Sequence, residues 1–285
     1  MRRFLLTISL LFFSIVSAQH VLPVAGIIVN AETGNPLEFV NIGFNSMKIG
    51  TVSKQDGSFL MNVRKNLLGS NDHLIISSIG YHSEFIPSAE WSTWTNTDRI
   101  ILLQPETTQL DPVVITAGKR EFERLGSESY SFSDLGFWND EDALGGELAT
   151  RIKIYKPRTK LIDFKFHVLE NEADSVKVRI NIYNCDKNMP GRNILTENIF
   201  HTITTKKGVE KVSLKEYNII ADYDVVVGIE MVEFYGDTLY LSVSATPFGG
   251  TAYLRERSQS GWDVRWNFGL AFGLLSSYPQ TTMKP

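Results

Sequence analysis

Turn-forming residues recur at short intervals between residues 24 and 117, and apolar or β-branched runs fill the intervals. Gly34 and Pro36 interrupt one such run, and the Asp56-Gly57 pair stands between two others. Glycine readily adopts the positive φ of tight turns, and an Asp-Gly pair between apolar runs predicts a β-hairpin. The stretch has no helical periodicity of useful length. We therefore expect a small all-β sandwich at residues 24–104.

Residues 37–44 alternate in character. Because successive side chains of a strand point to opposite faces, Val40, Ile42 and Phe44 would share one face while Phe39 and Asn41 share the other. The more apolar set is the expected core face.

The first residues have the composition of a secretory signal peptide. Arg2 and Arg3 precede an almost wholly apolar run at residues 4–16, and Val16-Ser17-Ala18 offers small residues for cleavage. The run is shorter than the ~20 residues that a membrane-spanning helix needs. We expect a signal peptide at residues 1–18, an exported protein, and no transmembrane segment in the mature chain.

The spaced turns, together with Ser78-Ile-Gly80-Tyr81, resemble those of the carboxypeptidase-regulatory-like domain. The resemblance implies a seven-stranded, transthyretin-like (prealbumin-like) sandwich. Such domains occur in exported proteins of Gram-negative bacteria, including the N-terminus of TonB-dependent outer-membrane receptors, where a segment similar to Leu110–Ala117 leads to the plug. The resemblance thus implies the periplasm, outer membrane or cell surface. It implies no activity, and the residues that follow are too few for a plug and a barrel of about 22 strands.

The remainder of the chain predicts a linker and a second β domain. Residues 105–146 combine charged, Ser-rich and Gly-rich segments, as linkers do. From residue 147 onward, apolar and polar residues alternate again, for example at 162–168 and 176–182. One apolar and one polar face per strand predict an antiparallel sandwich, which the strand number makes jelly-roll-like, at residues 147–285.

Charge and cysteine content exclude several classes of function. The chain has 28 Lys and Arg against 32 Asp and Glu, a formal net charge of −4. Nucleic acid is therefore not an expected partner, because phosphate binding needs a basic footprint. Cys185 is the only cysteine, which excludes a disulfide framework. No metal or cofactor is expected.

Two groups of residues in the second domain are candidate ligand contacts. The first is a basic set of outward parity that could hold an anionic glycan or an acidic loop of a partner; its members are Arg151, Lys153, Lys165, Lys177 and Arg179, with His167 among them. The second is an aromatic set, in which Trp262 and Trp266 would share a strand face near Tyr253 and Arg255. Exposed aromatic rings stack on sugars, although core packing is the alternative for both tryptophans.

Catalytic patterns are weak by comparison. His167 and Glu170 form an H-x-x-E pair, but positions three apart on a strand point to opposite faces and would not converge on zinc. Acid pairs such as Glu230 with Glu233 could serve a glycosidase, but a chain with 32 acids offers such pairs by chance. We expect a non-enzymatic binding or assembly module for a glycan or a cell-envelope protein. The alternative is a hydrolase of glycans or peptides with acidic catalytic residues in the second domain.

Overall fold

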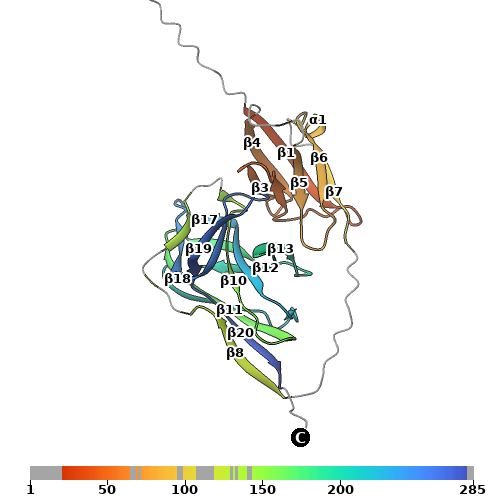
Figure 1. Ribbon diagram of the computed structural model, residues 1–285. Coiled ribbons are helices and arrows are strands. Elements are labelled where there is room, and N and C mark those ends of the chain that lie inside the picture. Colours follow the sequence, from red (N-terminus) through yellow and green to blue (C-terminus); the bar gives the residue numbers. More distant parts are fainter. Residues whose placement is uncertain are drawn as a thin grey trace, which may run out of the picture.

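The structure is a computed structural model that describes residues 21–64, 69, 72–94, 99–106, 119–128, 131, 134–139 and 143–280. It shows an all-β protein of two domains, with the smaller one at one end of the larger (Figure 1). The predicted signal peptide at residues 1–18 and the segment Leu110–Ala117 lie outside the described residues. Within the part of the chain that is described, no helix is long and apolar enough to cross a membrane.

The first domain packs a three-stranded sheet of order β4-β1-β7 against a four-stranded sheet of order β3-β2-β5-β6. Its elements are β1 (Val21–Asn30), β2 (Asn41–Gly43), β3 (Gly50–Val52), β4 (Ser58–Arg64), β5 (His73–Ser77), β6 (Glu84–Pro87), α1 (Ser88–Trp91) and β7 (Ile100–Leu103). Val40, Ile42 and Phe44 are fully buried in its core, as their alternation predicts. The expected seven-stranded sandwich is confirmed.

The hairpin predicted at Asp56-Gly57 is wrong. The turn is present, since Gly57 has φ 76° and the Asp56 carboxylate accepts the Ser58 N–H at 3.0 Å. However, β3 before the turn pairs with β2, and β4 after it pairs with β1. The turn therefore carries the chain from one sheet of the sandwich to the other, a choice that depends on tertiary packing and not on the local turn.

The second domain is built from antiparallel strands in a 13-stranded sheet. Its elements are β8 (Arg120–Gly126), β9 (Asp134–Trp138), β10 (Glu147–Ile152), β11 (Thr159–Asn171), β12 (Ser175–Asp186), β13 (Met189–Asn193), β14 (Ile199–Ile203), β15 (Gly208–Ser213), β16 (Ile220–Ala221), β17 (Val225–Tyr235), β18 (Leu241–Arg255), β19 (Asp263–Leu270) and β20 (Phe272–Pro279).

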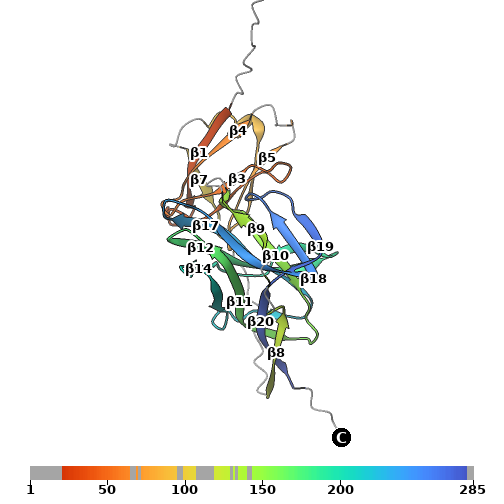
Figure 2. The same cartoon turned by 90° about the vertical axis from the view of Figure 1, so that its left-hand side faces the viewer.

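The large sheet folds into two layers that β18 joins. The first part of β18 pairs with β9 and β11, and its last part pairs with β10 and β19. Between these parts its register shifts from Pro247 to Thr251, where Phe248 and Gly250 have positive φ. Such bulges bend a strand. The strand thereby passes from one layer to the other (Figure 2), and the expected antiparallel sandwich is confirmed.

Part of the predicted linker belongs to the second domain. β8 pairs with β20, and β9 pairs with β18, although both strands lie within residues 105–146. The sequence of β8 has no alternation of apolar residues that would predict a strand, because five of its seven residues are charged or glycine. A hydrophobic pattern therefore does not predict its pairing with β20, to which Arg120 adds a side-chain hydrogen bond at Ser277.

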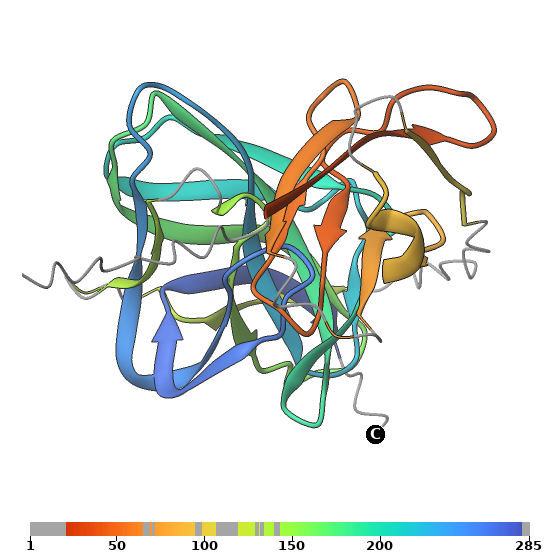
Figure 3. The same cartoon turned by 90° about the horizontal axis from the view of Figure 1, so that it is seen from above.

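The first domain covers part of the outer face of the layer that contains β12, β17, β10 and β19 (Figure 3). The Phe39 side chain lies outside the core of the first domain and packs against Val232 of the second domain, and Phe39 has φ 53°. Gly43 and Gly50 lie directly against the Ser258 carbonyl, and a Cβ at Gly43 would lie 2.3 Å from that oxygen. The interface therefore requires small residues on the side of the first domain.

Phe164→Ala should destabilise the second domain by about 3–5 kcal/mol, because large-to-small changes in a core lose burial and leave a cavity. The Phe164 side chain is fully buried, and its ring contacts those of Phe166 and Phe272 at centroid distances of 5.5 and 5.2 Å. Urea unfolding followed by fluorescence measures the change. Phe122→Ala on the exposed surface of β8 is the control and should change stability by no more than about 0.5 kcal/mol. Equal effects of the two substitutions would contradict the proposed core.

Candidate functional site

Four charged residues stand opposite one another on four neighbouring strands of the large sheet. Arg179 on β12 faces Glu230 on β17, Glu230 faces Glu147 on β10, and Glu147 faces Arg255 on β18. Directly opposite residues in antiparallel strands project from the same face. We call this set the charge row. It crosses the outer face of its layer, and the side chains of Arg179, Glu230 and Glu147 are at most 3% exposed.

Arg179 and Glu230 form a bidentate ion pair. Arg179 Nε donates to Glu230 Oε2 at 2.9 Å, and Nη2 donates to Oε1 at 2.8 Å. The first domain completes the arrangement, because Arg179 Nη1 donates to the Phe39 carbonyl at 2.8 Å and the Asn41 side chain bridges Arg179 and Glu230. A buried ion pair is tolerated when its remaining hydrogen-bonding groups are also satisfied. Here, the Phe39 carbonyl and the Asn41 side chain of the first domain supply these hydrogen bonds.

Glu147 lies over Gly228 and shares a donor with Glu230. A Cβ at Gly228 would lie 2.2 Å from Glu147 Oε1, so only glycine leaves room for this carboxyl group. Asn181 Nδ2 is 3.0 Å from Glu147 Oε1 and 2.9 Å from Glu230 Oε2. The Tyr183 hydroxyl lies within hydrogen-bond distance of both oxygens of Glu147, at 3.0 and 2.9 Å, and donates to this carboxyl group. Two carboxyl groups are thus held next to each other by a shared amide.

The environments of these two carboxyl groups move their pKa values apart. Burial raises the pKa of Glu147 to about 7; the charge of Arg255 opposes this rise and that of Glu230 adds to it. Burial would also raise the pKa of Glu230, but the charge and hydrogen bonds of Arg179 outweigh it, and the pKa is lowered. At neutral pH, Glu230 is therefore ionised while Glu147 is partly protonated.

Arg255 stands at the end of the charge row, beside Glu147 and Tyr183. Its Nη1 is 3.5 Å from Glu147 Oε2, and its guanidinium carbon lies 4.0 Å from the centre of the Trp262 ring. Arg255 Nε is buried and has no hydrogen-bond partner among the described residues. Stacking on an aromatic ring fixes the plane of a guanidinium and so the direction of its donors.

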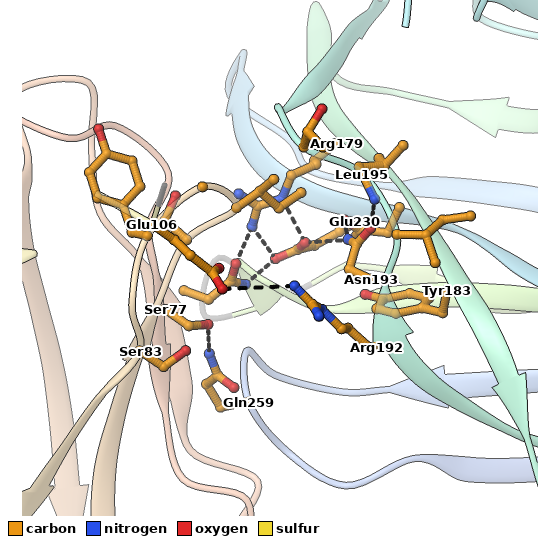
Figure 4. Close-up of a pocket in the computed structure, with 18 of the residues that line it drawn as sticks. Ser77, Ser83, Glu106, Arg179, Tyr183, Arg192, Asn193, Leu195, Glu230 and Gln259 are labelled. Atoms are coloured by element: carbon orange, nitrogen blue, oxygen red, sulfur yellow. Dashed lines mark hydrogen bonds and ion pairs between the residues drawn. The ribbon is translucent and has the colours of Figure 1, made fainter. Parts of the chain in front are cut away.

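A cavity of about 480 Å³ opens between the two domains over this row (Figure 4). The first domain contributes the segment around Ser77–Ser83 and Glu106, and the second contributes β12, the segment after β13, and Gln259. Figure 4 shows Arg179, Glu230 and Asn193 along one wall, with Arg192 reaching toward Glu106 on the other side. Gln259 Nε2 donates to Ser77 Oγ at 2.6 Å across the domain boundary. The cavity therefore exists only while the two domains are docked.

The predicted basic set does not form one surface. Arg151, Lys177 and Arg179 share the outer face of the layer with the charge row, but Lys165 and His167 project from β11 in the other layer, and Lys153 follows the end of β10. Arg151 pairs with Asp224 at 2.6 Å, and the ammonium of Lys177 lies 4.8 Å from the ring centre of Phe39. Consecutive strands of a sandwich commonly belong to different layers, and strand parity alone cannot reveal this.

The predicted aromatic set is divided between buried and exposed positions. Tyr253 is fully buried, and Trp262 packs edge-on against Tyr183 and Tyr253. Trp266 is 63% exposed on β19. Trp262 thus packs against Arg255 and the two tyrosines, whereas Trp266 lies on the exposed surface of β19.

The H-x-x-E pair has no geometry for a metal. His167 is buried, its Nδ1 is 2.7 Å from Ser244 Oγ, and burial lowers its pKa. Glu170 is exposed on the same strand. Across the described residues, no three His, Cys, Asp or Glu side chains are grouped as metal ligands would be.

The sequence pattern does not single out Glu147, and it offers Glu233 as a partner for Glu230, whereas in the structure Glu147 lies opposite Glu230. One signal was available, because Glu230 interrupts the otherwise apolar run 225–232, and a charge inside such a run needs a buried partner. Its partners, however, are set by strand order and by the docking of Asn41. Neither can be read from local pattern.

The chain is therefore a two-domain β protein with a polar cavity between its domains. Residues 24–115 match the CarboxypepD_reg-like domain family, so the predicted resemblance is confirmed, and a second, larger β-sheet domain follows. No curated protein matches the chain.

Two solved structures are distantly similar to the chain. One is the crystal structure of the cysteine protease and lectin-like domains of Cwp84, a surface layer associated protein of Clostridium difficile, at 9% identity and a TM-score of 0.37 over 84% of this chain and 58% of that one. The other is a variant of the same clostridial cysteine protease after propeptide cleavage, at 9% identity and a TM-score of 0.38 over 84% of this chain and 65% of that one. The chain spans less than two thirds of either structure. At this distance, the likeness supports no activity.

Glu147→Gln should change how stability depends on pH. The pKa of Glu147 is about 7 in the folded protein against an ordinary 4.5, so its proton stabilises the folded state below pH 4.5, and this contribution is lost as the pH rises through 7. The loss is on the order of 3 kcal/mol. Urea unfolding at several values between pH 4.5 and 8 should show the wild type losing stability relative to Glu147→Gln. Parallel profiles for the two proteins would contradict the raised pKa.

Proposed function

We propose that this protein is an exported, non-enzymatic binding module of the periplasm or outer-membrane surface of a Gram-negative bacterium, and that its ligand is a glycan held in the cavity between the two domains. The observation that carries the proposal is the cavity itself, with walls made of polar side chains from both domains. Ligand sites are commonly concave, of a few hundred Å³, and placed at domain boundaries.

The chemistry of the cavity walls suits a ligand rich in hydroxyl groups. Four carboxamides, at Asn41, Asn181, Asn193 and Gln259, line it together with the hydroxyls of several serines. A carboxamide offers both donors and an acceptor in one plane, and a sugar hydroxyl is itself both donor and acceptor. The apolar part of the lining includes Ile79, Ile194 and Leu195, which can pack against the C–H face of a sugar ring.

In this proposal, the first domain takes part in forming the ligand site. It closes one side of the cavity through residues 77–83, and it fixes the charge row through Phe39 and Asn41. A cell-envelope protein as partner would bind surfaces outside the cavity. The glycan proposal makes the more specific prediction, because it names the cavity residues whose substitution should abolish binding.

Ser83→Trp should abolish glycan binding while leaving the fold intact. Ser83 is exposed at the cavity mouth, so an indole there fills the cavity without entering a core. A glycan array identifies a ligand for the wild type, and titration calorimetry with thermal shift then compares the variants, because a ligand of the native state must raise its melting temperature. Thr204→Trp, exposed outside the cavity lining, is the matched control and should bind as the wild type does. Binding that survives Ser83→Trp would place the ligand elsewhere.

One observation favours a second candidate function, hydrolysis of glycans. Glu147 and Glu230 are neighbouring carboxyl groups with pKa values displaced in opposite directions, as an acid and its ionised partner are in many glycosidases. Against this function, both carboxyl groups are engaged by Tyr183, Asn181 and Arg179. They also line different cavities: Glu230 lines the one between the domains, whereas Glu147 lines a separate one of about 290 Å³. An acid and its partner must reach the same substrate bond to act together.

A polysaccharide panel decides between binding and hydrolysis. Incubation with the wild type should release no reducing ends above a heat-treated control. If reducing ends are released, and if Glu147→Gln and Glu230→Gln each abolish the release while both variants remain folded, the hydrolase is correct. The folded state of each variant is checked by circular dichroism and by its unfolding midpoint.

A further inference from the structure

The first domain turns one outer sheet face toward the second domain and the other toward solvent. The outer face of the sheet β3-β2-β5-β6 meets the second domain, which Asn41 and Gly43 of β2 contact directly. The other sheet has the order β4-β1-β7, and its inner residues, such as Ile28 and Ile101, are buried in the core of the domain. The residues that alternate with these inner ones therefore point outward.

Aliphatic side chains from all three strands of this sheet meet on its outward face. The register places Leu60 beside Ala25 and Ile100 beside Ile27, and residues directly opposite each other share a face. Four of the outward side chains are 48% to 60% exposed, and two that lie among them are half-buried. We call this set the uncovered face; its members are Val21, Leu60, Ile100 and Leu102, with Ile27 and Val29.

The composition of the uncovered face restricts what can cover it. A sheet face in water is normally polar, and contiguous apolar side chains on it mark an interaction surface. Among the outward side chains of β1, β4 and β7, three strands that the structure describes in full, none is aromatic and only Arg64 is charged. A sugar would find no ring to stack on, and a membrane surface is usually bound through aromatic residues and several Lys or Arg. A second flat aliphatic sheet face fits better than either.

Two charges of opposite sign stand at the two ends of β1. Arg64 lies opposite Val21, where the strand begins, and Glu32 follows two residues after Asn30, where it ends. Both are exposed, and neither has an ion-pair partner within the described ranges. Homodimers most often have a two-fold axis. An axis between two uncovered faces and perpendicular to β1 would bring Arg64 of each copy over the Glu32 end of the other.

The size of the uncovered face predicts a weak association. At about 3.4 Å per residue, β1 spans about 27 Å from Val21 to Val29, and three strands at about 4.8 Å each are about 14 Å wide. Two such faces bury about 800 Å² together, whereas a standard stable interface buries about 1,600 Å². We therefore expect a dissociation constant of about 0.1 mM.

We infer that this chain forms a weak homodimer in which two uncovered faces pack against each other about a two-fold axis, with Arg64 of each copy beside Glu32 of the other. The contact does not depend on the proposed glycan site, because none of the six residues of the uncovered face lines the cavity between the domains. A dimer therefore carries two such cavities, and a polysaccharide long enough to reach both would bind it more tightly than it binds a monomer.

Sedimentation equilibrium of the mature chain measures the association. The wild type should change from monomer to dimer as its concentration rises from about 10 μM to about 1 mM. Leu60→Lys places an ammonium group inside the apolar contact and should weaken the dimer by about ten-fold, because a buried charge without a partner is costly. Val209→Lys is the matched control and should dimerise as the wild type does, since Val209 is an aliphatic residue 55% exposed on β15 of the second domain.

Charge reversals test the orientation of the two copies. Arg64→Glu and Glu32→Arg each set like charges against each other at both ends of the dimer, and each should weaken it by about five-fold. The double variant restores opposite charges and should regain the affinity of the wild type. Both positions are exposed, so the fold tolerates the changes, and unfolding midpoints of all variants verify this.

The outcomes decide for or against the dimer independently of glycan binding. A wild type that stays monomeric up to about 1 mM, or a dimer that Leu60→Lys leaves unchanged, would overturn the inference. A double variant weaker than either single reversal would overturn the two-fold arrangement. Binding to vesicles of phosphatidylethanolamine and phosphatidylglycerol in place of dimerisation, lost in Leu60→Lys and kept in Val209→Lys, would make the uncovered face a lipid-binding surface instead. Dimerisation that Leu60→Lys removes and the double reversal restores to wild-type strength would confirm it.

Discussion

Arg179 carries its charge at a position that is 1% exposed, and every donor that it directs at the domain boundary meets an oxygen. Glu230 belongs to the same sheet, but Asn41 and the Phe39 carbonyl belong to the first domain. If the domains separated, water would have to replace these two groups around a charge pair set in an apolar sheet. Hydrophobic contact at Phe39 and Val232 favours docking without direction, whereas the hydrogen bonds of Arg179 fix one orientation.

That orientation determines the cavity. The charge row crosses four strands at one level, and Gly228 is the position at which the missing side chain lets Glu147 lie flat against the sheet. The docked domain hydrogen-bonds Arg179, and Arg179, Glu230 and Arg255 all line the cavity beside this contact. One sheet surface is thus used twice, for domain attachment and for the proposed ligand. Both uses depend on strand register, because a one-residue slip would turn every member of the row toward the core.

Much of the architecture could be predicted from the sequence, because it depends on local period and turn chemistry. The core faces at Val40 and Phe164 follow from alternation, and the family of residues 24–115 follows from turn spacing. The site could not be predicted as a whole. Arg179 is predicted from its place in the basic set and Arg255 from its nearness to the aromatic set, but their buried partners Glu147 and Glu230 follow from strand order, which alternation does not encode. Likewise, no hydrophobic alternation marks β8 as a partner of β20, and the Asp56-Gly57 turn joins two sheets.

A ligand bound in the cavity, as proposed, would link its own binding equilibrium to the docking of the two domains. The walls of the cavity come from both domains, so a ligand that contacts residues 77–83 and Arg255 together binds only the docked form. Such a ligand stabilises docking by its own binding free energy, and any change that weakens the contacts of Arg179 with the first domain must weaken ligand binding by the same linkage. A mainly polar interface allows such linkage. The hydrogen bonds of Arg179 fix the orientation of the domains, while apolar contact is confined to the surroundings of Phe39. A larger apolar interface would keep the domains docked with or without ligand, so ligand binding could not shift the docking equilibrium.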